Sequence, residues 1–355
     1  MIDLTLPGDA LTASLVDVPS VSGGESRLAD EVETALKPVD HLTIERDGDA
    51  ILARTDLGRP QRIVIAGHLD TVPVADNLPA RRDGDKLFGC GTSDMKAGLA
   101  VMLRVASTLA DPRHDVNWLF YDNEETDAAH NGLGRVARNA PEWLKTDLAI
   151  LMEPTANRVE AGCQGTLRVL VVVPGKRAHS ARSWLGDNAI HRAGEVLRRL
   201  AAYEARRVVI DGCEYREGLN AVRIEGGVSG NVVPDRCTVI VNFRFAPDRD
   251  EGEALAHVQE VLAPFECVPT DSAAGALPML NEPAAAEFVE AIGGEPQAKL
   301  GWTDVARFAA LGIPAVNFGP GDPNLAHTRE EYVEIPRIGE CERVLRGYLA
   351  EAGEQ

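Results

Sequence analysis

The chain has 355 residues, of which 45% are hydrophobic and 26% are charged, and its formal net charge is −19 at pH 7. The length is sufficient for two domains, and the composition is that of an ordinary globular protein. The negative charge argues against nucleic acids and anionic membranes as partners. The sequence has neither a secretion-type N-terminus nor the roughly 18 uninterrupted apolar residues of a membrane helix, so we expect a cytoplasmic protein.

The first half of the chain is predicted to alternate helices and strands. The expected elements up to residue 175 are helices over 11–18, 25–36 and 96–109, strands over 42–45, 50–54, 62–66 and 148–152, and a strand that ends at residue 123. This order is typical of an α/β domain with a mostly parallel sheet.

A different pattern follows between residues 177 and 283. The expected elements are helices over 188–204 and 251–262 and strands over 221–225 and 236–245, entered from an apolar strand over 167–173. A β-α-β-β-α-β order is typical of a split βαβ, ferredoxin-like unit of the α+β class. The α/β pattern then resumes with segments 284–291, 305–311 and 314–318 and a closing helix over 337–350. We therefore assign residues 1–176 and 284–355 to a catalytic domain and residues 177–283 to an inserted domain.

Four short apolar runs end in, or shortly before, side chains that can bind metal. These side chains are His68 with Asp70, Glu124 with Glu125, Glu153, and His327. Apolar runs bounded by turn residues are typical of buried strands, and in an open α/β sheet ligands gather at the carboxyl ends of such strands. The repetition predicts one metal centre.

His68 and Asp70 are two residues apart, so they face the same way if the chain is extended there. We assign His68 as a ligand and Asp70 as the carboxylate that orients its imidazole, with a surface ion pair as the alternative. Asp94 lies just before the helix predicted from residue 96. It could bridge two ions or simply cap that helix. Its segment lacks the residue order of a phosphate-binding loop.

Glu124 and Glu125 are adjacent acids after a buried strand and cannot face the same way. One can bind metal while the other holds the attacking water, although a solvated acidic turn is the alternative. The six cysteines form no Cys-x-x-Cys pair. Imidazole and carboxylate donors without thiolates favour a catalytic zinc pair, with manganese or cobalt as chemically suitable substitutes. Two such ions about 3.5 to 4 Å apart could polarise a carbonyl and generate hydroxide.

Five motifs stand in an order and spacing known from one enzyme family. They are Gly67–Pro73, Gly89–Gly98, Asp122–Glu125, Met152–Thr155 and Ala326–His327. On these motifs the chain resembles the M20 metallopeptidases, which are di-zinc amide hydrolases, over almost its whole length. The resemblance implies one zinc ion bound by His68, Asp94 and Glu153. It implies a second zinc ion bound by Asp94, Glu125 and His327.

The same resemblance implies that Glu124 is the general base and that Asp70 supports His68. Within the family the chain is most similar to the succinyl-diaminopimelate desuccinylases of actinobacteria, particularly over residues 160–166 and 179–191. His179 matches a histidine that reaches the active site of the partner subunit and stabilises the tetrahedral oxyanion there. This implies a homodimer with the inserted domain as its interface.

Four residues match family positions near the substrate, namely Arg244, Asn231, Thr303 and Thr166. The guanidinium of Arg244 could bind a substrate carboxylate or form a cross-strand ion pair. The other three residues are also common in turns and caps.

Two segments depart from the desuccinylases of proteobacteria. Cys163–Thr166 stands where those enzymes have Arg-Arg-Gly-Ser, and Trp302 precedes Thr303 where they have Gly-Gly-Thr. One anion-binding arginine is therefore absent, with Arg182 and Arg307 as candidate substitutes.

The expected reaction is hydrolysis of N-succinyl-LL-2,6-diaminopimelate to succinate and LL-2,6-diaminopimelate, a step towards lysine and peptidoglycan precursors. Two alternatives stay open. The first is another deacylase or peptidase of the family, similar to acetylornithine deacetylase, aminoacylase or carboxypeptidase. The second is a non-catalytic zinc-binding protein that keeps the fold.

Overall fold

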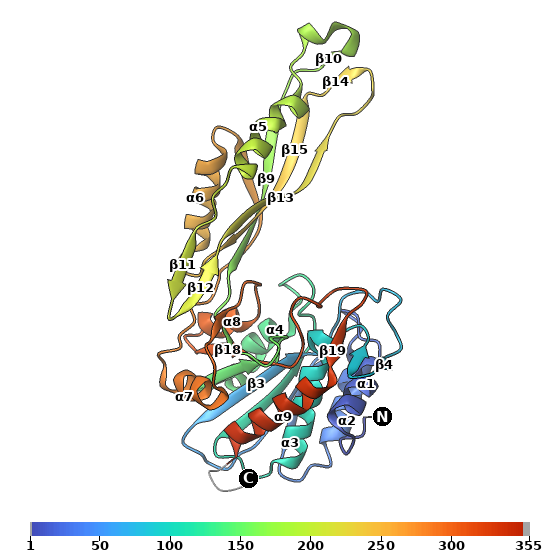
Figure 1. Cartoon of the computed structure of the whole chain (residues 1–355), viewed down its shortest axis with the longest axis vertical. Helices are drawn as coiled ribbons and strands as arrows, with labels where there is room; N and C mark the ends of the chain where they lie inside the picture. The colour runs from blue at the N-terminus through green and yellow to red at the C-terminus, as the bar shows by residue number, and fades with distance from the viewer. Residues whose placement is uncertain (1, 351–355) are drawn as a thin grey trace. The chain divides into compact units, whose positions relative to one another are not determined.

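A computed structural model describes residues 2–350 (Figure 1). The described chain forms two compact units. Unit 1 contains residues 2–161, 278–297 and 307–350, and unit 2 contains residues 162–277 and 298–306. The division differs from the expected one because strand β9 (Gly165–Pro174) pairs with strands of unit 2, and because residues 298–306 return to that unit.

Unit 1 is built on an eight-stranded sheet in the order β1-β2-β6-β3-β7-β18-β8-β17. The strands are β1 (Thr43–Asp47), β2 (Ala50–Arg54), β3 (Arg62–His68), β6 (Asp115–Tyr121), β7 (Leu148–Leu151), β8 (Glu160–Ala161), β17 (Gln297–Ala298) and β18 (Ala315–Asn317). The four central strands β6, β3, β7 and β18 are parallel, whereas β1, β2 and β8 pair antiparallel. β6 and β7 are buried along their whole length, as expected for central strands of a parallel sheet.

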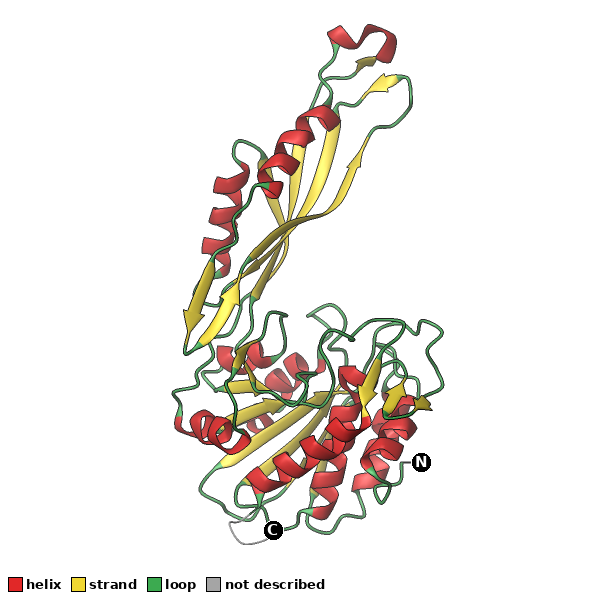
Figure 2. Cartoon of the chain, in the orientation of Figure 1, coloured by secondary structure: helices red, strands yellow, loops and turns green. Residues whose placement is uncertain are grey.

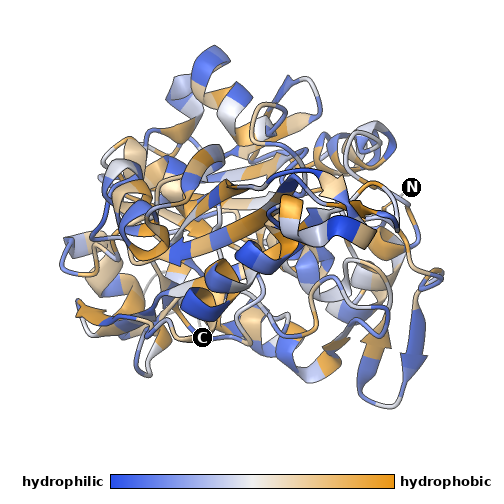
Figure 3. Cartoon of the chain, turned by 90° about the horizontal axis from the view of Figure 1, so that it is seen from above, coloured by the Kyte–Doolittle hydropathy of each residue, from blue (hydrophilic) through white to orange (hydrophobic). Residues whose placement is uncertain are grey.

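Helices cover this sheet. They are α1 (Gly8–Val16), α2 (Ser26–Leu36), α3 (Ala97–Thr108), α4 (Gly132–Asn139), α7 (Pro283–Ile292), α8 (Val305–Ala310) and α9 (Ile335–Leu349), with the short helices η1 (Thr92–Lys96) and η2 (Pro141–Leu144). In α9 the buried residues Ile338, Cys341 and Leu345 recur at helical spacing and form one apolar stripe. The helices accordingly carry both hydrophobic and hydrophilic residues (Figure 3). α1, α3 and α9 pack against one another.

A small antiparallel sheet in unit 1 was not predicted. It has the order β19-β5-β4, from β4 (Arg81–Asp83), β5 (Lys86–Phe88) and β19 (Tyr332–Glu334). The turn between β4 and β5 contains Gly84 at φ +58°, so an Asp-Gly turn signal was present in the sequence. β19 brings the chain after His327 against the chain before Asp94.

Unit 2 contains a four-stranded antiparallel sheet in the order β13-β15-β9-β16 (Figure 2). Its elements are β9, β10 (Ala178–His179), η3 (Ser180–Leu185), α5 (Ala189–Ala201), β11 (Arg207–Ile210), β12 (Cys213–Arg216), β13 (Gly218–Gly226), β14 (Val232–Val233), β15 (Arg236–Phe245), α6 (Glu251–Leu262) and β16 (Glu266–Ala273). β9 and β15 bury every second residue, and these apolar side chains form one core with residues of α5 and α6. The β-α-β-β-α-β order of β9, α5, β13, β15, α6 and β16 is the predicted split βαβ unit.

The predicted fold class is confirmed in both units. β2, β15 and α6 have the predicted bounds, and α3 differs from its prediction by one residue at each end. Some short elements were missed, among them α4 and the hairpin of β11 and β12. Among the helices of residues 2–350, none combines the length and the apolar character needed to cross a bilayer.

Candidate metal centre

The ends of the four central parallel strands place the predicted ligands at one edge of the sheet. β3 ends at His68, β6 is followed by Glu124 and Glu125, β7 by Glu153, and β18 by the loop that carries His327. Because these strands are neighbours and parallel, their carboxyl ends lie together.

Close packing of α3 helps to place Glu153. A Cβ atom on Gly98 would collide with the carbonyl oxygen of Met152, the residue before Glu153. Glycine at this position therefore lets the first turn of α3 lie directly against the strand end.

His68, Asp94 and Glu153 form a first group of candidate ligands, whose donor atoms all lie within 4.8 Å of one another. His68 Nδ1 lies 3.0 Å from the backbone oxygen of Asp70 and 3.5 Å from its carboxylate Oδ1. Its Nε2 lies 3.2 Å from Asp94 Oδ1. A hydrogen bond from Nδ1 to Asp70 leaves Nε2 as the nitrogen that can bind a metal ion.

Asp94, Glu125 and His327 form a second group with the same 4.8 Å limit. His327 Nε2 lies 2.6 Å from Glu125 Oε1 and 3.5 Å from Asp94 Oδ2. The two oxygens of the Asp94 carboxylate thus face the two imidazoles, one in each group. Glu124 lies close by, since it forms a third group with His68 and Glu125.

The charges in these groups compensate one another. Hydrogen bonds to Asp94 and Glu125 raise the pKa of His327 to about 10. Burial alone would lower the pKa of His68, but hydrogen bonds to Asp70 and Asp94 hold it well above its usual value. Burial would raise the pKa of Asp94, but hydrogen bonds from His327 and His68 outweigh burial and lower it. A metal ion bound here would replace the imidazolium protons.

The donor set fits divalent zinc, manganese or cobalt. It consists of imidazole nitrogens and carboxylate oxygens, and none of the candidate groups among residues 2–350 contains a cysteine. Asp94 belongs to both groups, so its carboxylate could bridge a pair of ions.

Asp70 holds the two acids that follow β6. Its Oδ1 accepts a hydrogen bond from the backbone N–H of Glu124 and its Oδ2 one from that of Glu125, each at 2.9 Å. Ser22 Oγ donates to Oδ2 at 2.7 Å, a contact that nothing in the sequence indicated. Burial would raise the pKa of Asp70, but the hydrogen bonds from His68 and from the two N–H groups lower it. Asp70 therefore contacts both His68 and the backbone of the candidate base.

The structure pairs two of the four residues that were expected near the substrate. Arg244 on β15 lies directly opposite Thr166 on β9. Among residues 2–350 Arg244 forms no ion pair with a carboxylate, so the cross-strand ion pair considered above is not observed. Burial and the neighbouring Arg168 lower the pKa of Arg244. Thr303 is buried in the 298–306 segment.

His179 and Asn231 lie side by side in unit 2. β10 and β14 pair so that His179 is opposite Val232, and Ser180 N–H donates to the backbone oxygen of Asn231 at 2.9 Å. Nδ1 of the exposed His179 accepts the N–H of Ala181 at 3.0 Å, so the neutral ring carries its proton on Nε2. Of the two candidate substitutes for the missing arginine, Arg182 follows in η3 and Arg307 lies in α8 of unit 1.

Comparisons with known proteins agree with this arrangement. The sequence profile of peptidase family M20/M25/M40 matches residues 64–351. The chain belongs to this family. A Mycobacterium tuberculosis protein provisionally named succinyl-diaminopimelate desuccinylase DapE is 60% identical over 352 residues, covering 98% of this chain and 99% of that protein. The succinyl-diaminopimelate desuccinylase of Corynebacterium glutamicum is 49% identical over 361 residues, covering 98% of each chain.

The M20 fold is also found in solved structures. A tripeptidase from Staphylococcus aureus superposes with a TM-score of 0.77 at 20% identity, covering 100% of both chains. The predicted resemblance to M20 enzymes, and within them to the actinobacterial desuccinylases, is confirmed. The chain is thus an M20 metal-dependent hydrolase with a candidate set of metal ligands.

Proposed function

We propose that this protein hydrolyses N-succinyl-LL-2,6-diaminopimelate to succinate and LL-2,6-diaminopimelate, a step in the synthesis of lysine and peptidoglycan precursors. The observation that carries the proposal is the identity of 60% and 49% to relatives with this name over at least 98% of each chain. The clustering of the predicted ligands supports the chemistry.

Two divalent ions, zinc in the first instance, would be held by His68, Asp94 and Glu153 and by Asp94, Glu125 and His327. Ions bound there would polarise the amide carbonyl and make water acidic enough to lose a proton near neutral pH. Glu124 accepts that proton and delivers it to the nitrogen of the leaving amine as the C–N bond breaks. Asp70 keeps the backbone of Glu124 in place through the 2.9 Å hydrogen bond.

Arg244 is the residue proposed to bind the succinyl carboxylate. Its guanidinium stays charged at neutral pH and has no carboxylate partner among residues 2–350, so a carboxylate of the substrate can pair with it. Thr166, opposite Arg244, offers a hydroxyl on the same side of the sheet. Asn231 and Thr303 complete the proposed substrate-binding residues.

A panel of acylated amines tests the proposal. We expect kcat/KM for release of succinate from N-succinyl-LL-2,6-diaminopimelate to be at least about 10²-fold higher than for release of acetate from the N-acetyl analogue. The acetyl group has no carboxylate, so the guanidinium of Arg244 would be left without its partner. Preference for N-acetylornithine or a dipeptide would instead assign the chain to another M20 deacylase or peptidase. Zinc binding without hydrolysis of any compound in the panel would favour a non-catalytic role.

The active form is proposed to be a homodimer in which His179 of one copy donates a hydrogen bond to the oxyanion in the other. The edge strand β13 exposes the apolar residues Val222 and Ile224, which supports an interface in unit 2. His179→Asn should lower kcat by about 10² to 10³-fold without changing metal content. Sedimentation analysis should show a dimer; a monomer with full activity would contradict the proposal.

The six cysteines are unpaired in the structure, which is compatible with the reducing cytoplasm, where we place the reaction.

A further inference from the structure

Glu331 is a buried carboxylate to which the sequence assigned no role. Its side chain is 2% exposed, and it accepts three backbone hydrogen bonds from the loop before α3. Oε2 accepts the N–H of Gly91 at 3.0 Å, and Oε1 accepts those of Ser93 at 2.8 Å and of Asp94 at 3.0 Å. The carboxylate therefore contacts the backbone of the aspartate that faces both imidazoles.

This loop needs an acceptor of that kind. Asp94 lies within η1, but its backbone is not helical, at φ −121° and ψ 94°. Gly91, the residue before η1, is left-handed at φ +81°. The N–H groups of Gly91, Ser93 and Asp94 are not paired with carbonyl oxygens as they would be in a regular helix, and Glu331 supplies the acceptors instead. Burying a carboxylate is costly unless hydrogen bonds compensate it, and the three N–H groups of this loop provide that compensation.

Further contacts join the same two segments of chain. The N–H of Gly89 donates to the backbone oxygen of Glu331 at 3.1 Å, and Ser93 Oγ donates to that of Tyr332 at 2.7 Å. A Cβ atom on Gly321 would collide with the carbonyl oxygen of Ser93, so the segments also touch before His327. One of these segments carries Asp94, and the other carries His327, four residues before Glu331.

We propose that Glu331 is a positioning residue for the metal ion held by Asp94, Glu125 and His327. It fixes the separation of two ligands that come from loops about 230 residues apart in the sequence. Glu125 is held separately, by Asp70. This inference rests on the proposed metal-dependent function.

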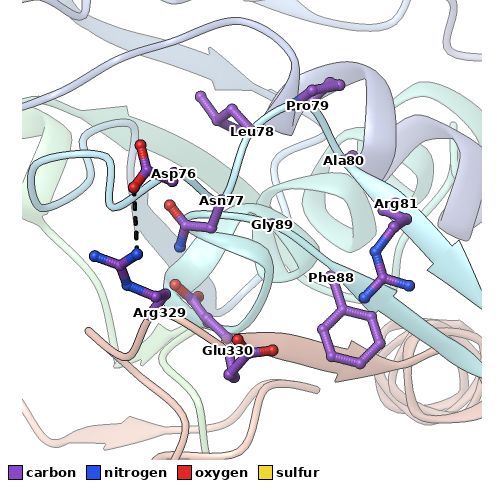
Figure 4. Close-up of a pocket in the computed structure, with 11 residues that line it drawn as sticks. Asp76, Asn77, Leu78, Pro79, Ala80, Arg81, Phe88, Gly89, Arg329 and Glu330 are labelled. Atoms are coloured by element: carbon purple, nitrogen blue, oxygen red, sulfur yellow. Dashed lines mark hydrogen bonds and ion pairs between the residues drawn. The ribbon is translucent and has the colours of Figure 1, made fainter.

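The neighbouring Glu330 provides a matched control. It is exposed and lines a pocket of about 580 Å³, in which Asp76 and Arg329 form an ion pair at 3.2 Å (Figure 4). Glu330 and Glu331 have the same chemistry and adjacent positions, and among the described residues it is the Glu331 carboxylate that accepts the hydrogen bonds of the Asp94 loop.

The experiment is a zinc titration of the full-length apoprotein, read by competition with a chelator. We expect two ions in the wild type and in Glu330→Gln. Glu331→Gln should bind the second ion about 10 to 100-fold more weakly and the first ion nearly unchanged, because an amide has one acceptor atom and turns an N–H donor towards the backbone. Glu331→Asp keeps the charge but not the reach and should show a smaller shift in the same direction. It also replaces Glu331→Gln if that variant does not fold.

Three outcomes separate the possible failures. Wild-type affinity for both ions in folded Glu331→Gln and Glu331→Asp would overturn the positioning role. An equal loss of affinity for both ions would overturn the positioning role as well, since such a loss would indicate a general packing effect. Absence of zinc binding in the wild type would overturn the proposed metal-dependent function itself.

Discussion

Replacing Glu124 by glutamine should lower kcat for succinate release by about 10² to 10⁴-fold, with zinc content unchanged. Glutamine has nearly the same shape but cannot accept the proton of the attacking water. Its backbone N–H can still donate to Asp70, so the local structure should be retained. Steady-state kinetics together with metal analysis of the same preparation measure both quantities.

Glu125→Gln is the natural comparison, because it changes the adjacent acid in the same way. Glu125 lies 2.6 Å from His327 and belongs to a candidate ligand group, so this variant should lose metal as well as activity. If Glu124→Gln keeps near-normal turnover with zinc bound, Glu124 is not the base. If both variants lose metal equally, the assignment of separate roles to the two acids is wrong.

Asp94→Asn should have an effect at least as large, since one carboxylate serves both candidate ligand groups. Asparagine keeps a single oxygen and no charge, so one imidazole faces an amide nitrogen in place of an acceptor. We expect fewer than two zinc ions per chain. Loss of a bound ion removes several kcal/mol of transition-state stabilisation, so turnover should fall by about 10³-fold or more.

Asp83→Asn, on the exposed strand β4, is the control for this substitution. It removes the same charge from a residue that belongs to none of the candidate ligand groups, so zinc content and kcat should be unchanged. Chelation of the wild type should abolish activity, and added zinc should restore it. Hydrolysis that survives complete chelation, or two zinc ions retained in Asp94→Asn, would contradict the proposed site.

The fold was largely predictable because its main elements have strong hydrophobic patterns. The order of residues alone shows the apolar alternation of β9 and β15. It also shows the apolar runs of β3, β6 and β7. The unit boundary was displaced because strand pairing, which a single strand cannot reveal, assigns β9 to unit 2. The sheet of β4, β5 and β19 was missed because its three-residue strands are too short for a periodic signal.

The site shows the same limit. His68, Glu125 and Glu153 could be expected from strand ends, since parallel neighbours bring their carboxyl ends together. Ser22 and Glu331 could not, because a serine or glutamate in a loop has no pattern that indicates its partner. The position of Glu331 shortly after His327 was the one available signal. Ser22 contacts the carboxylate of Asp70, and Glu331 contacts the backbone of Asp94. Such contacts are defined only once the chain is folded.

The distribution of residues between the units has a consequence for how such enzymes diversify. All candidate metal ligands and the candidate base belong to unit 1, whereas Arg244, Thr166, Asn231, Thr303 and His179 belong to unit 2. Under the proposed roles, substitutions of Arg244, Thr166, Asn231 or Thr303 would change which acyl group is accepted and leave the candidate metal ligands in place. His179 is the exception, because it is the residue of unit 2 proposed to serve the hydrolytic step itself. Selection could then explore new substrates while one cleavage chemistry is kept for many amides.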